Sequence, residues 1–413
     1  KKKIFVRGPV LSQSGYGEQS RFALRALRSR EDLFDIYIKP TAWGQTGWVW
    51  EDNEFRRWLD KKITDTQIQL QQKTLQPEMS LQITIPTEFQ KMTPFNIGYT
   101  AGIETTKVSP DWLQKGNENI DKILVVSEHA KQTYEDTVAI ATSNETGETV
   151  DYKLTTPIEV VWENTLRHEP EEIPGFDLEN KFNFLMVSQM GPRKNFQNAI
   201  SWWVEEFIDQ KVGLVIKTNV KNNSNMDLEL TKNTLKSVLS KYPNRKCKVY
   251  LLHGDLSSGQ MTSLYTNPKI KAMINISHGE GFGLPLFEAT REALPIITIG
   301  WSGQMDFLEH DGQKYFESVD FTLQPIQKEA VWPGVLEESS MWAYADQGSY
   351  KMSLRKMYKK WKKAKDTANK LKTINDEKFS NEKLYKIFVD SIIGFDSSLV
   401  SVSEESEAVV EFE

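Results

Sequence analysis

The chain has 413 residues and a net charge of −6. Its length exceeds that of one ordinary core and suits two domains. Its hydrophobic content of 39% excludes global disorder. The acidic balance gives no general indication of a polyanionic partner. The chain has one cysteine, Cys247, so an intrachain disulfide is excluded and we expect a reducing, cytoplasmic setting. No apolar run reaches membrane-spanning length, so we expect no transmembrane segment.

Short apolar runs alternate with amphipathic ones along the chain. Those at "KIFVRG", "PFNIGYT" and "DKILVVS" precede helix-like segments such as "GEQSRFALRALRS" and "SEHAKQTYED". After the acidic, proline-bearing stretch "RHEPEEIPGFDLENK", a predicted linker, the pattern restarts with "KFNFLMVS", "VGLVIKT", "CKVYLLHG", "AMINIS" and "LPIITIG". This alternation predicts an α/β chain with parallel sheets and helices on both faces. We expect domains at residues 1–165 and 166–375, with residues 376–413 forming a helix and acidic tail that cross back to the first domain.

A glycine-rich loop follows the first apolar run. In "RGPVLSQSGYGEQSRF", Gly8, Gly15 and Gly17 flank the start of a predicted helix. No G-K-[ST] follows, which excludes the phosphate-binding loop of nucleoside triphosphatases, and the G-x-G-x-x-G spacing of dehydrogenases is missing. Such turns are common, so this loop alone does not identify a ligand.

Four tryptophans crowd the segment "KPTAWGQTGWVWEDNEFRRWLDKK". Either they are buried in a core, or they are exposed and stack on bases beside cations that contact phosphates. Acidic residues nearly cancel the basic charge of the segment, which favours burial. The tryptophans are Trp43, Trp48, Trp50 and Trp58.

The segment "SHGEGFGLPLFEAT", residues 277–290, joins a strand-like run to a helix-like run. In a doubly wound sheet, such a corner places a helix N-terminus where it favours a phosphate. Its glycines allow close approach of a ligand, and Pro285 suits the first helical turn. Glu280 and Glu288 suit hydroxyl groups of a sugar or ribose, because a carboxylate accepts several hydrogen bonds. The alternative is a glycine-rich turn with two solvated glutamates.

Several segments together carry a family resemblance. "EGFGLPLFE", with Glu280 and Glu288, resembles the E-x7-E signature of retaining glycosyltransferases of family four, which have the GT-B fold. "VSQMGPRKNFQNAI" is similar to their phosphate-binding segment, "HGDLSSGQMTSLYTN" to the stretch that positions the nucleotide, and "LPIITIGWSGQMDFL" to their G-x-P-V-I strand, with Leu294 replacing the usual glycine. "GYTAGIETTKVSPDW" and "DKILVVSEHAKQTY" resemble the mannosyltransferase-like branch. The resemblance is strong in the second domain and diffuse in the first.

The resemblance implies a GT-B fold, in which two Rossmann-like parallel-sheet domains face a cleft. It also implies transfer of a sugar from a nucleoside diphosphate sugar to an acceptor hydroxyl, with retention of anomeric configuration. The expected donor is a UDP-sugar, with a GDP-sugar as the alternative. We expect no metal, because the sequence has no Asp-x-Asp triplet and its five histidines lack metal-ligand spacing.

The same resemblance implies roles for single residues. Glu280 would lie beside the donor sugar, Lys194 would neutralise the diphosphate and Glu104 would act in the cleft. The family's partner arginine is Gln189 here, so Arg193 or Lys217 would supply the second cation that the leaving group needs. Alternatively, the acid and the cations are ordinary loop charges. The expected donor-binding set comprises Gly15, Gly17, Gln189, Arg193, Lys194, Lys217, Gly281, Phe282, Gly283, Leu284 and Glu288.

A basic stretch, "KMSLRKMYKKWKKAKDTANKLK", spans residues 351–372 and has a partial helical stripe of apolar residues. It predicts either a solvated helix with one buried face or a helix that faces a polyanion. The chain also resembles glycosyltransferases of tailed bacteriophages, which implies hydroxymethylated cytosine in double-stranded phage DNA as acceptor, in the host cytoplasm, with Lys351–Lys372 contacting phosphates.

Other acceptors and another class of function stay open. Transfer to a polysaccharide, a lipid-linked sugar or a protein is the alternative within the same class, and the basic helix would then rest on an anionic membrane. A noncatalytic DNA- or carbohydrate-binding protein on a GT-B shell is the alternative of another class.

Overall fold

The computed structural model describes residues 1–394, so almost all of the predicted acidic tail lies outside the described residues. The chain divides into two compact units. Within the described residues, unit 1 contains Lys1–Gly102, Lys107–Asn164 and residues 379–394. Unit 2 contains Thr165–Lys378 and the short segment Ile103–Thr106. Residues 161–181, which include the predicted linker, have no helix or strand.

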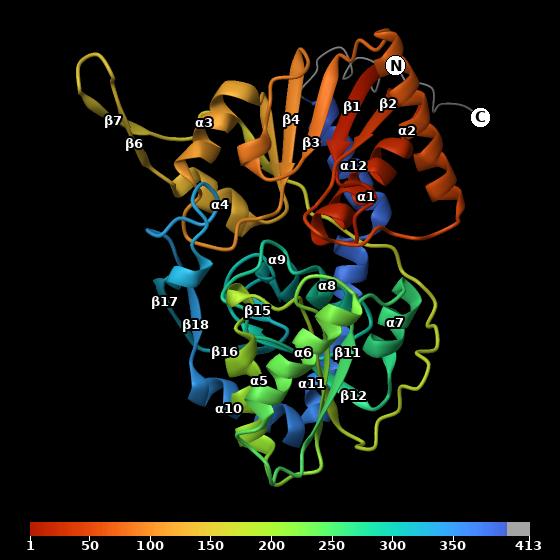
Figure 1. Ribbon diagram of the computed structural model, residues 1–413, viewed down its shortest axis with the longest axis vertical. Coiled ribbons are helices and arrows are strands. Elements are labelled where there is room, and N and C mark those ends of the chain that lie inside the picture. Colours follow the sequence, from red (N-terminus) through yellow and green to blue (C-terminus); the bar gives the residue numbers. More distant parts are fainter. Residues whose placement is uncertain (395–413) are drawn as a thin grey trace. The chain divides into compact units, whose positions relative to one another are not determined.

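A six-stranded parallel sheet forms the centre of unit 1 (Figure 1). Its strands, in spatial order, are β2 (Phe34–Pro40), β1 (Lys2–Gly8), β3 (Met79–Ile83), β4 (Phe95–Thr100), β5 (Lys122–Val125) and β8 (Ile158–Val160). This order is flavodoxin-like with one added edge strand. The predicted strands at β1, β4 and β5 are confirmed. Strand β3, in which polar Ser80 and Gln82 alternate with apolar residues, is buried throughout but was not predicted.

The sheet of unit 1 is flanked by helices (Figure 1). α12 comes from the end of the described chain and packs on α1, where Phe388 meets the ring of Phe22 at 6.0 Å between centroids. An antiparallel hairpin, β6 (Ala139–Thr142) with β7 (Thr149–Tyr152), projects from this unit. The helices are α1 (Gly15–Arg28), α2 (Glu54–Gln72), η1 (Pro86–Glu88), α3 (Pro110–Asn119), α4 (Glu128–Asp136) and α12 (Asn381–Ile393).

Unit 2 has its own six-stranded parallel sheet. Its strands, in spatial order, are β11 (Lys248–His253), β10 (Gly213–Thr218), β9 (Asn183–Val187), β12 (Ile270–Asn275), β13 (Ile296–Ile299) and β16 (Glu317–Val319). Numbered from the start of the unit, this is the Rossmann order 3-2-1-4-5-6. The strand order reverses between β9 and β12, and ligands of such sheets bind at the carboxyl ends of the strands at this point.

The remaining elements of unit 2 are helices and two antiparallel hairpins. Its helices are η2 (Pro192–Lys194), α5 (Phe196–Phe207), α6 (Asn225–Leu239), α7 (Ser258–Thr266), α8 (Leu284–Arg291), α9 (Met305–Leu308), η3 (Lys328–Ala330), α10 (Gln347–Lys359) and α11 (Trp361–Lys378). Its hairpins pair β14 (Glu309–His310) with β15 (Gln313–Lys314), and β17 (Phe321–Pro325) with β18 (Met341–Ala345). The predicted α/β class with two Rossmann-like parallel sheets is confirmed.

Aromatic side chains fill the core of unit 2. Trp203 and Phe207 lie four residues apart on α5 and therefore share one helix face. Both pack against Phe184 of β9, with ring centroids 6.2 and 5.3 Å away. All three side chains are fully buried. This packing fixes α5, and with it the loop from β9 into η2, over the sheet.

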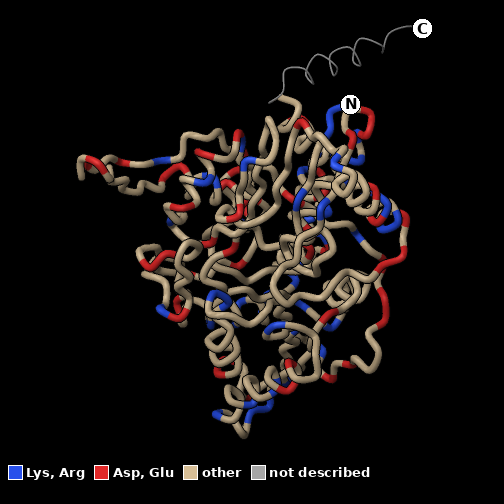
Figure 2. The backbone as a smooth tube through the Cα atoms, turned by 45° about the horizontal axis from the view of Figure 1, so that its top comes forward, with Lys and Arg blue, Asp and Glu red and all other residues tan. Residues whose placement is uncertain are grey.

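The basic stretch at residues 351–372 forms parts of two helices, α10 and α11, rather than one. Lys360 between them has φ −120° and ψ 31°, which ends α10. Trp361 starts α11, and its indole N–H donates to the carbonyl of Lys271 at 2.8 Å. Several of its cations pair with acidic residues of unit 2, and basic and acidic positions are interspersed along the whole described chain (Figure 2).

The tryptophan-rich segment of unit 1 differs from the expectation of burial. Trp48 and Trp50 are 67% and 93% exposed, so that interpretation is wrong for these two. The reason is that their loop contacts the neighbouring β1–α1 loop mainly through backbone, as in the 2.8 Å bond from Val49 N–H to the Leu11 carbonyl. Trp43 does pack, 4.3 Å from the ring of Tyr16.

Candidate functional site

A buried ion-pair cluster lies where the strand order of unit 2 reverses. Glu280, on the loop after β12, is 6% exposed. Its Oε1 accepts from Lys194 Nζ at 2.6 Å, and its Oε2 accepts from Arg193 Nη1 at 2.9 Å. Both cations belong to η2, which follows β9. Two loops that are remote in sequence therefore meet at the carboxyl ends of β9 and β12 and bring three predicted residues together.

Two polar residues that were not predicted hold Glu280 in place. Asn275, the last residue of β12, donates from Nδ2 to Glu280 Oε1 at 3.1 Å. The backbone N–H of Glu280 donates to Ser302 Oγ at 2.9 Å. The only signal in the sequence was a polar residue at the end of an apolar run in "AMINIS" and in "LPIITIGWSG". Glu280 is thus fixed by side chains from three loops.

Glu104 joins this cluster through a short segment that belongs to unit 2. Thr106 N–H donates to the Met341 carbonyl at 2.9 Å, and Met341 N–H donates to Thr106 Oγ1 at 3.0 Å. This anchoring on β18 places Glu104 Oε1 3.7 Å from Arg193 Nε. A Cβ on Gly279 would lie 2.1 Å from the Glu104 carbonyl oxygen, so this approach requires glycine.

The four charges perturb one another. Burial raises the pKa of Glu104, and the charge of Glu280 adds to this effect while Arg193 opposes it. Burial acts in the same direction on Glu280, but the charges of Lys194 and Arg193, with hydrogen bonds from Lys194 and Asn275, hold the pKa of Glu280 well below its usual range. Burial and the charge of Arg193 lower the pKa of Lys194. Glu104 is therefore the carboxylate that takes up a proton most easily.

The loop between β12 and α8 offers backbone rather than side chains. Gly283 precedes the first turn of α8 with φ +94°, a conformation that favours glycine. Phe282 is buried, and its ring packs 5.0 Å from the ring of Phe307. A Cβ on Gly303 would lie only 2.0 Å from the carbonyl oxygen of Gly281. The loops after β12 and β13 therefore touch backbone to backbone.

The other predicted residues of unit 2 lie in different surroundings. Glu288 on α8 accepts from the Tyr265 hydroxyl at 3.0 Å. Burial lowers the pKa of Lys217, at the end of β10, and the charges of Asp255 and Glu288 oppose that shift. Gln189 is exposed and donates from Nε2 to the Val220 carbonyl at 2.8 Å. Of the two cations considered as replacements for the arginine absent at Gln189, Arg193 is the one beside Lys194.

Gly15 and Gly17 lie in unit 1, at the start of α1. The Ser14 hydroxyl accepts from Gly17 N–H at 3.0 Å and caps the helix. A Cβ on Gly17 would lie 1.9 Å from the Ser12 carbonyl oxygen, whereas one on Gly15 would meet nothing within 4 Å. The close contact with the Ser12 carbonyl is therefore sufficient reason for a glycine at position 17.

His278 is a further residue of this region that was not predicted. Its Nδ1 lies 2.7 Å from the Ala343 carbonyl and therefore carries the proton, which leaves Nε2 to accept from Gln327 Nε2 at 2.9 Å. The imidazole stacks on Trp342 with ring centroids 5.1 Å apart, and burial lowers its pKa. His278 ties the Glu280 loop to the β17–β18 hairpin as a neutral side chain.

Within residues 1–394, His, Cys, Asp and Glu side chains form no group of three or more that can hold a metal ion. Over the same residues, no helix combines the length and apolar character required to cross a membrane.

Comparisons with known proteins bear on the fold. The chain is similar to sucrose-phosphate synthase from Thermosynechococcus elongatus, with a TM-score of 0.62 and 11% identity over 96% of this chain and 100% of that one. The fold is GT-B. HepE from Anabaena, solved with UDP and glucose, has a TM-score of 0.57 and 11% identity over 95% of this chain and 99% of that one.

The sequence comparisons are more limited in extent. No protein-family model matches the chain. A stretch of 115 residues is 31% identical to the serotype-specific mannosyltransferase WbdA of Escherichia coli, which is 28% of this chain. The match covers 13% of the length of that relative.

Proposed function

We propose that this protein is a glycosyltransferase that moves a sugar from a nucleoside diphosphate sugar to an acceptor hydroxyl, with retention of anomeric configuration. The observation that carries the proposal is the cluster of Glu280, Lys194 and Arg193 at the point where the strand order of unit 2 reverses. Cations beside a glycine-rich loop suit a diphosphate, and a carboxylate beside them suits sugar hydroxyls. The resemblance to family four supports the proposal at two of these residues, because it implies roles for Glu280 and Lys194, whereas Arg193 was expected only as a replacement for the family's arginine.

In the proposed reaction, the bond between the sugar anomeric carbon and the diphosphate oxygen breaks. The acceptor oxygen bonds to that carbon on the same face, and its proton passes to the departing diphosphate. Negative charge grows on the diphosphate, and Arg193 and Lys194 stabilise it in a site that is largely screened from water. Glu280 would turn from its cations to the donor sugar, while Glu288 would bind the ribose.

For the donor we propose a UDP-sugar, with a GDP-sugar as the alternative, and no metal ion in the site. HepE was solved with UDP, which supports the uridine nucleotide. The named activity of the curated relative is mannosyl transfer, so mannose is the first sugar to test with either nucleotide.

For the acceptor we propose a hydroxyl of a glycan. The relative with sequence similarity is a serotype-specific mannosyltransferase. Cations of the basic stretch that were expected to contact DNA, among them Lys351, Arg355 and Lys356, are paired with Glu205, Glu206 and Glu317. Hydroxymethylated cytosine in DNA stays a prediction, and the mass of a glycosylated duplex would test it.

The activity is tested with a panel of UDP- and GDP-linked sugars, by measuring the nucleoside diphosphate that is released. We expect turnover of at least one donor by the native protein and a loss of about 100-fold or more in Glu280→Gln. Glu229→Gln is the matched control, because Glu229 is an exposed glutamate on α6 of the same unit that pairs with Lys232. Its activity should equal that of the native protein.

Retention is tested on the first sugar released when water replaces the acceptor. An α-linked donor should give the α-anomer in proton NMR spectra recorded before mutarotation. No nucleoside diphosphate from any donor, together with no thermal stabilisation by UDP or GDP, would overturn the proposed activity. Initial release of the β-anomer would overturn retention alone.

A further inference from the structure

A second cation-rich site occurs in unit 2, on the edge strand β16. A cavity of about 360 Å³ lies between this strand, the start of β13 and the junction of α10 and α11. Its walls carry Lys314, Lys356, Lys360 and Lys363, and Glu317 is the only acidic residue among the described residues that line it. We call it the lysine cavity. β13 separates β16 from β12 in the sheet, so this cavity is distinct from the Glu280 cluster.

Three of these four lysines lack a compensating charge. Glu317 Oε2 lies 2.7 Å from Lys356 Nζ and neutralises that residue. Within residues 1–394, Lys314, Lys360 and Lys363 have no carboxylate within ion-pair distance, whereas Lys351, Arg355 and Lys372 of the same basic stretch do. The walls thus hold an excess of three positive charges.

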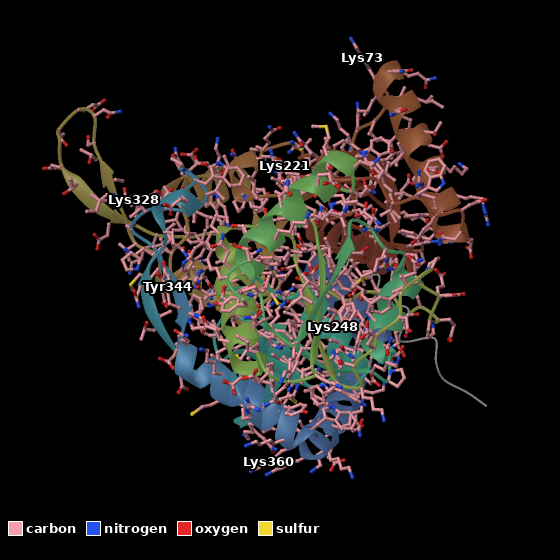
Figure 3. The ribbon with its side chains drawn as sticks, turned by 60° about the horizontal axis from the view of Figure 1, so that its bottom comes forward. Lys73, Lys221, Lys248, Lys328, Tyr344 and Lys360 are labelled. Carbon is pink, nitrogen blue, oxygen red and sulfur yellow. The ribbon has the colours of Figure 1, made fainter. Side chains whose placement is uncertain are left out.

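The fold sets the backbone positions from which these exposed lysines extend. Trp361 is anchored by its bond to the Lys271 carbonyl, and the ammonium of Lys271 lies 4.4 Å from the centre of its ring. This anchor sets the bend that puts Lys360 at the end of one helix and Lys363 in the first turn of the next (Figure 3). Lys314 comes from the β14–β15 hairpin, and its Nζ lies 3.2 Å from where a Cβ on Gly300 would be.

Helix stability does not account for this arrangement. A cation at the end of α10 is favoured by the helix dipole, but one in the first turn of α11 is opposed by it. The first turn of α11 has no acidic residue to balance Lys363. The cluster therefore carries a local electrostatic cost that an anion would remove.

We propose that the lysine cavity binds a phosphate-bearing group. Lysine ammonium groups bind phosphate as point charges, and Ser318 and Thr367 in the walls add hydroxyls. The volume falls within the range of about 300–1,000 Å³ that is usual for small-molecule sites. A DNA duplex is too wide to enter a cavity of this size, so a small phosphate or a lipid headgroup fits better.

The test compares two triple variants of the full chain that lose the same charge. The first is Lys314→Gln, Lys360→Gln and Lys363→Gln. The control is Lys359→Gln, Lys362→Gln and Lys370→Gln, whose lysines are exposed on the same two helices and do not line the cavity. Both are made in a background with Arg193→Gln and Lys194→Gln, so that phosphate probes cannot bind at the Glu280 cluster.

The probes are inorganic pyrophosphate, titrated by calorimetry, and vesicles of phosphatidylcholine with about one-third phosphatidylglycerol, assayed by cosedimentation. We expect binding by the background protein and the control, weakened about tenfold or more in the cavity variant because its cation–phosphate contacts are lost. Lys→Arg at the same three positions should retain binding. Pyrophosphate binding without vesicle binding identifies a soluble ligand, and vesicle binding identifies a lipid headgroup.

Three results would overturn the proposal. One is that neither probe binds to the background protein. Another is an equal loss in both triple variants, which indicates diffuse surface electrostatics. The third is that the protein binds a short DNA duplex but neither probe, and that both triple variants weaken the DNA binding equally. Circular dichroism melts of all variants show whether each one is folded before binding is compared.

Discussion

At the scale of single residues, the Glu280 cluster holds two cations and two carboxylates in one buried place. In the proposed function, a nucleoside diphosphate would bring further negative charge to Arg193 and Lys194, and two ionised carboxylates would oppose it. Burial already raises the pKa of Glu104, the carboxylate 3.7 Å from Arg193. Protonation of Glu104 therefore offers the least costly way to accommodate the ligand.

We predict that UDP binding is accompanied by proton uptake at Glu104. The ligand raises the pKa of Glu104 further, so this contribution to affinity is full at low pH. As pH rises from the pKa of Glu104 in the free protein to its pKa in the complex, the affinity for UDP falls by up to about tenfold per pH unit, and this contribution is lost. Glu104→Gln should bind UDP more tightly than the native protein at the upper end of that range.

The measurement is calorimetric titration of UDP in two buffers that differ in ionisation enthalpy, which gives the number of protons taken up. Native protein should take up more protons than Glu104→Gln, and the exposed-residue control Glu229→Gln should match the native protein. Equal uptake by all three proteins would rule out the role of Glu104. UDP itself also takes up protons in this range. The role of Glu104 is therefore judged from the difference in proton uptake between the native protein and the variants.

At the scale of elements, the Glu280 loop keeps its place because two loops touch through backbone. We predict that Gly303→Ala lowers the stability of unit 2 by about 3 kcal/mol, since its Cβ would lie 2.0 Å from the Gly281 carbonyl oxygen and backbone cannot move aside cheaply. This corresponds to a Tm lower by roughly 5–10 °C, measured by calorimetry. Gly15→Ala, at a helix start with open space around it, should leave Tm unchanged. An unaltered Tm in Gly303→Ala would contradict this account of the contact.

At the scale of the whole molecule, unit 1 depends on a helix from the end of the described chain. Phe388 of α12 is fully buried, between Phe22 of α1 and Tyr99 of β4, with centroids at 6.0 and 5.7 Å. We predict that Phe388→Ala destabilises unit 1 by about 3–5 kcal/mol, measured by denaturant unfolding. Val150→Ala, 62% exposed on the β6–β7 hairpin, should change stability by less than about 0.5 kcal/mol. Similar values for both variants would show that α12 contributes little to unit 1.

The sequence predicted the sheet strands that are continuous apolar runs, but it missed β2, β3, β8 and β16, which are short or interrupted by polar residues. It also predicted Glu280 and Lys194, because both lie in recognisable segments. Local patterns could not reveal that these residues, 86 positions apart, form one ion pair. Composition also does not encode which surfaces the neighbouring elements leave open. The exposure of Trp48 and Trp50 depends on those surfaces, and so does the bend at Lys360.

The division of the chain has a consequence for synthesis. The six sheet strands and the β6–β7 hairpin of unit 1 are made before any strand of unit 2. Helix α12, which covers Phe22, is made after all of unit 2. On a ribosome, the second unit to emerge is therefore the first that can complete its core. Until α12 arrives, one face of α1 stays uncovered and open to chaperones. The order of completion is opposite to the order of the chain.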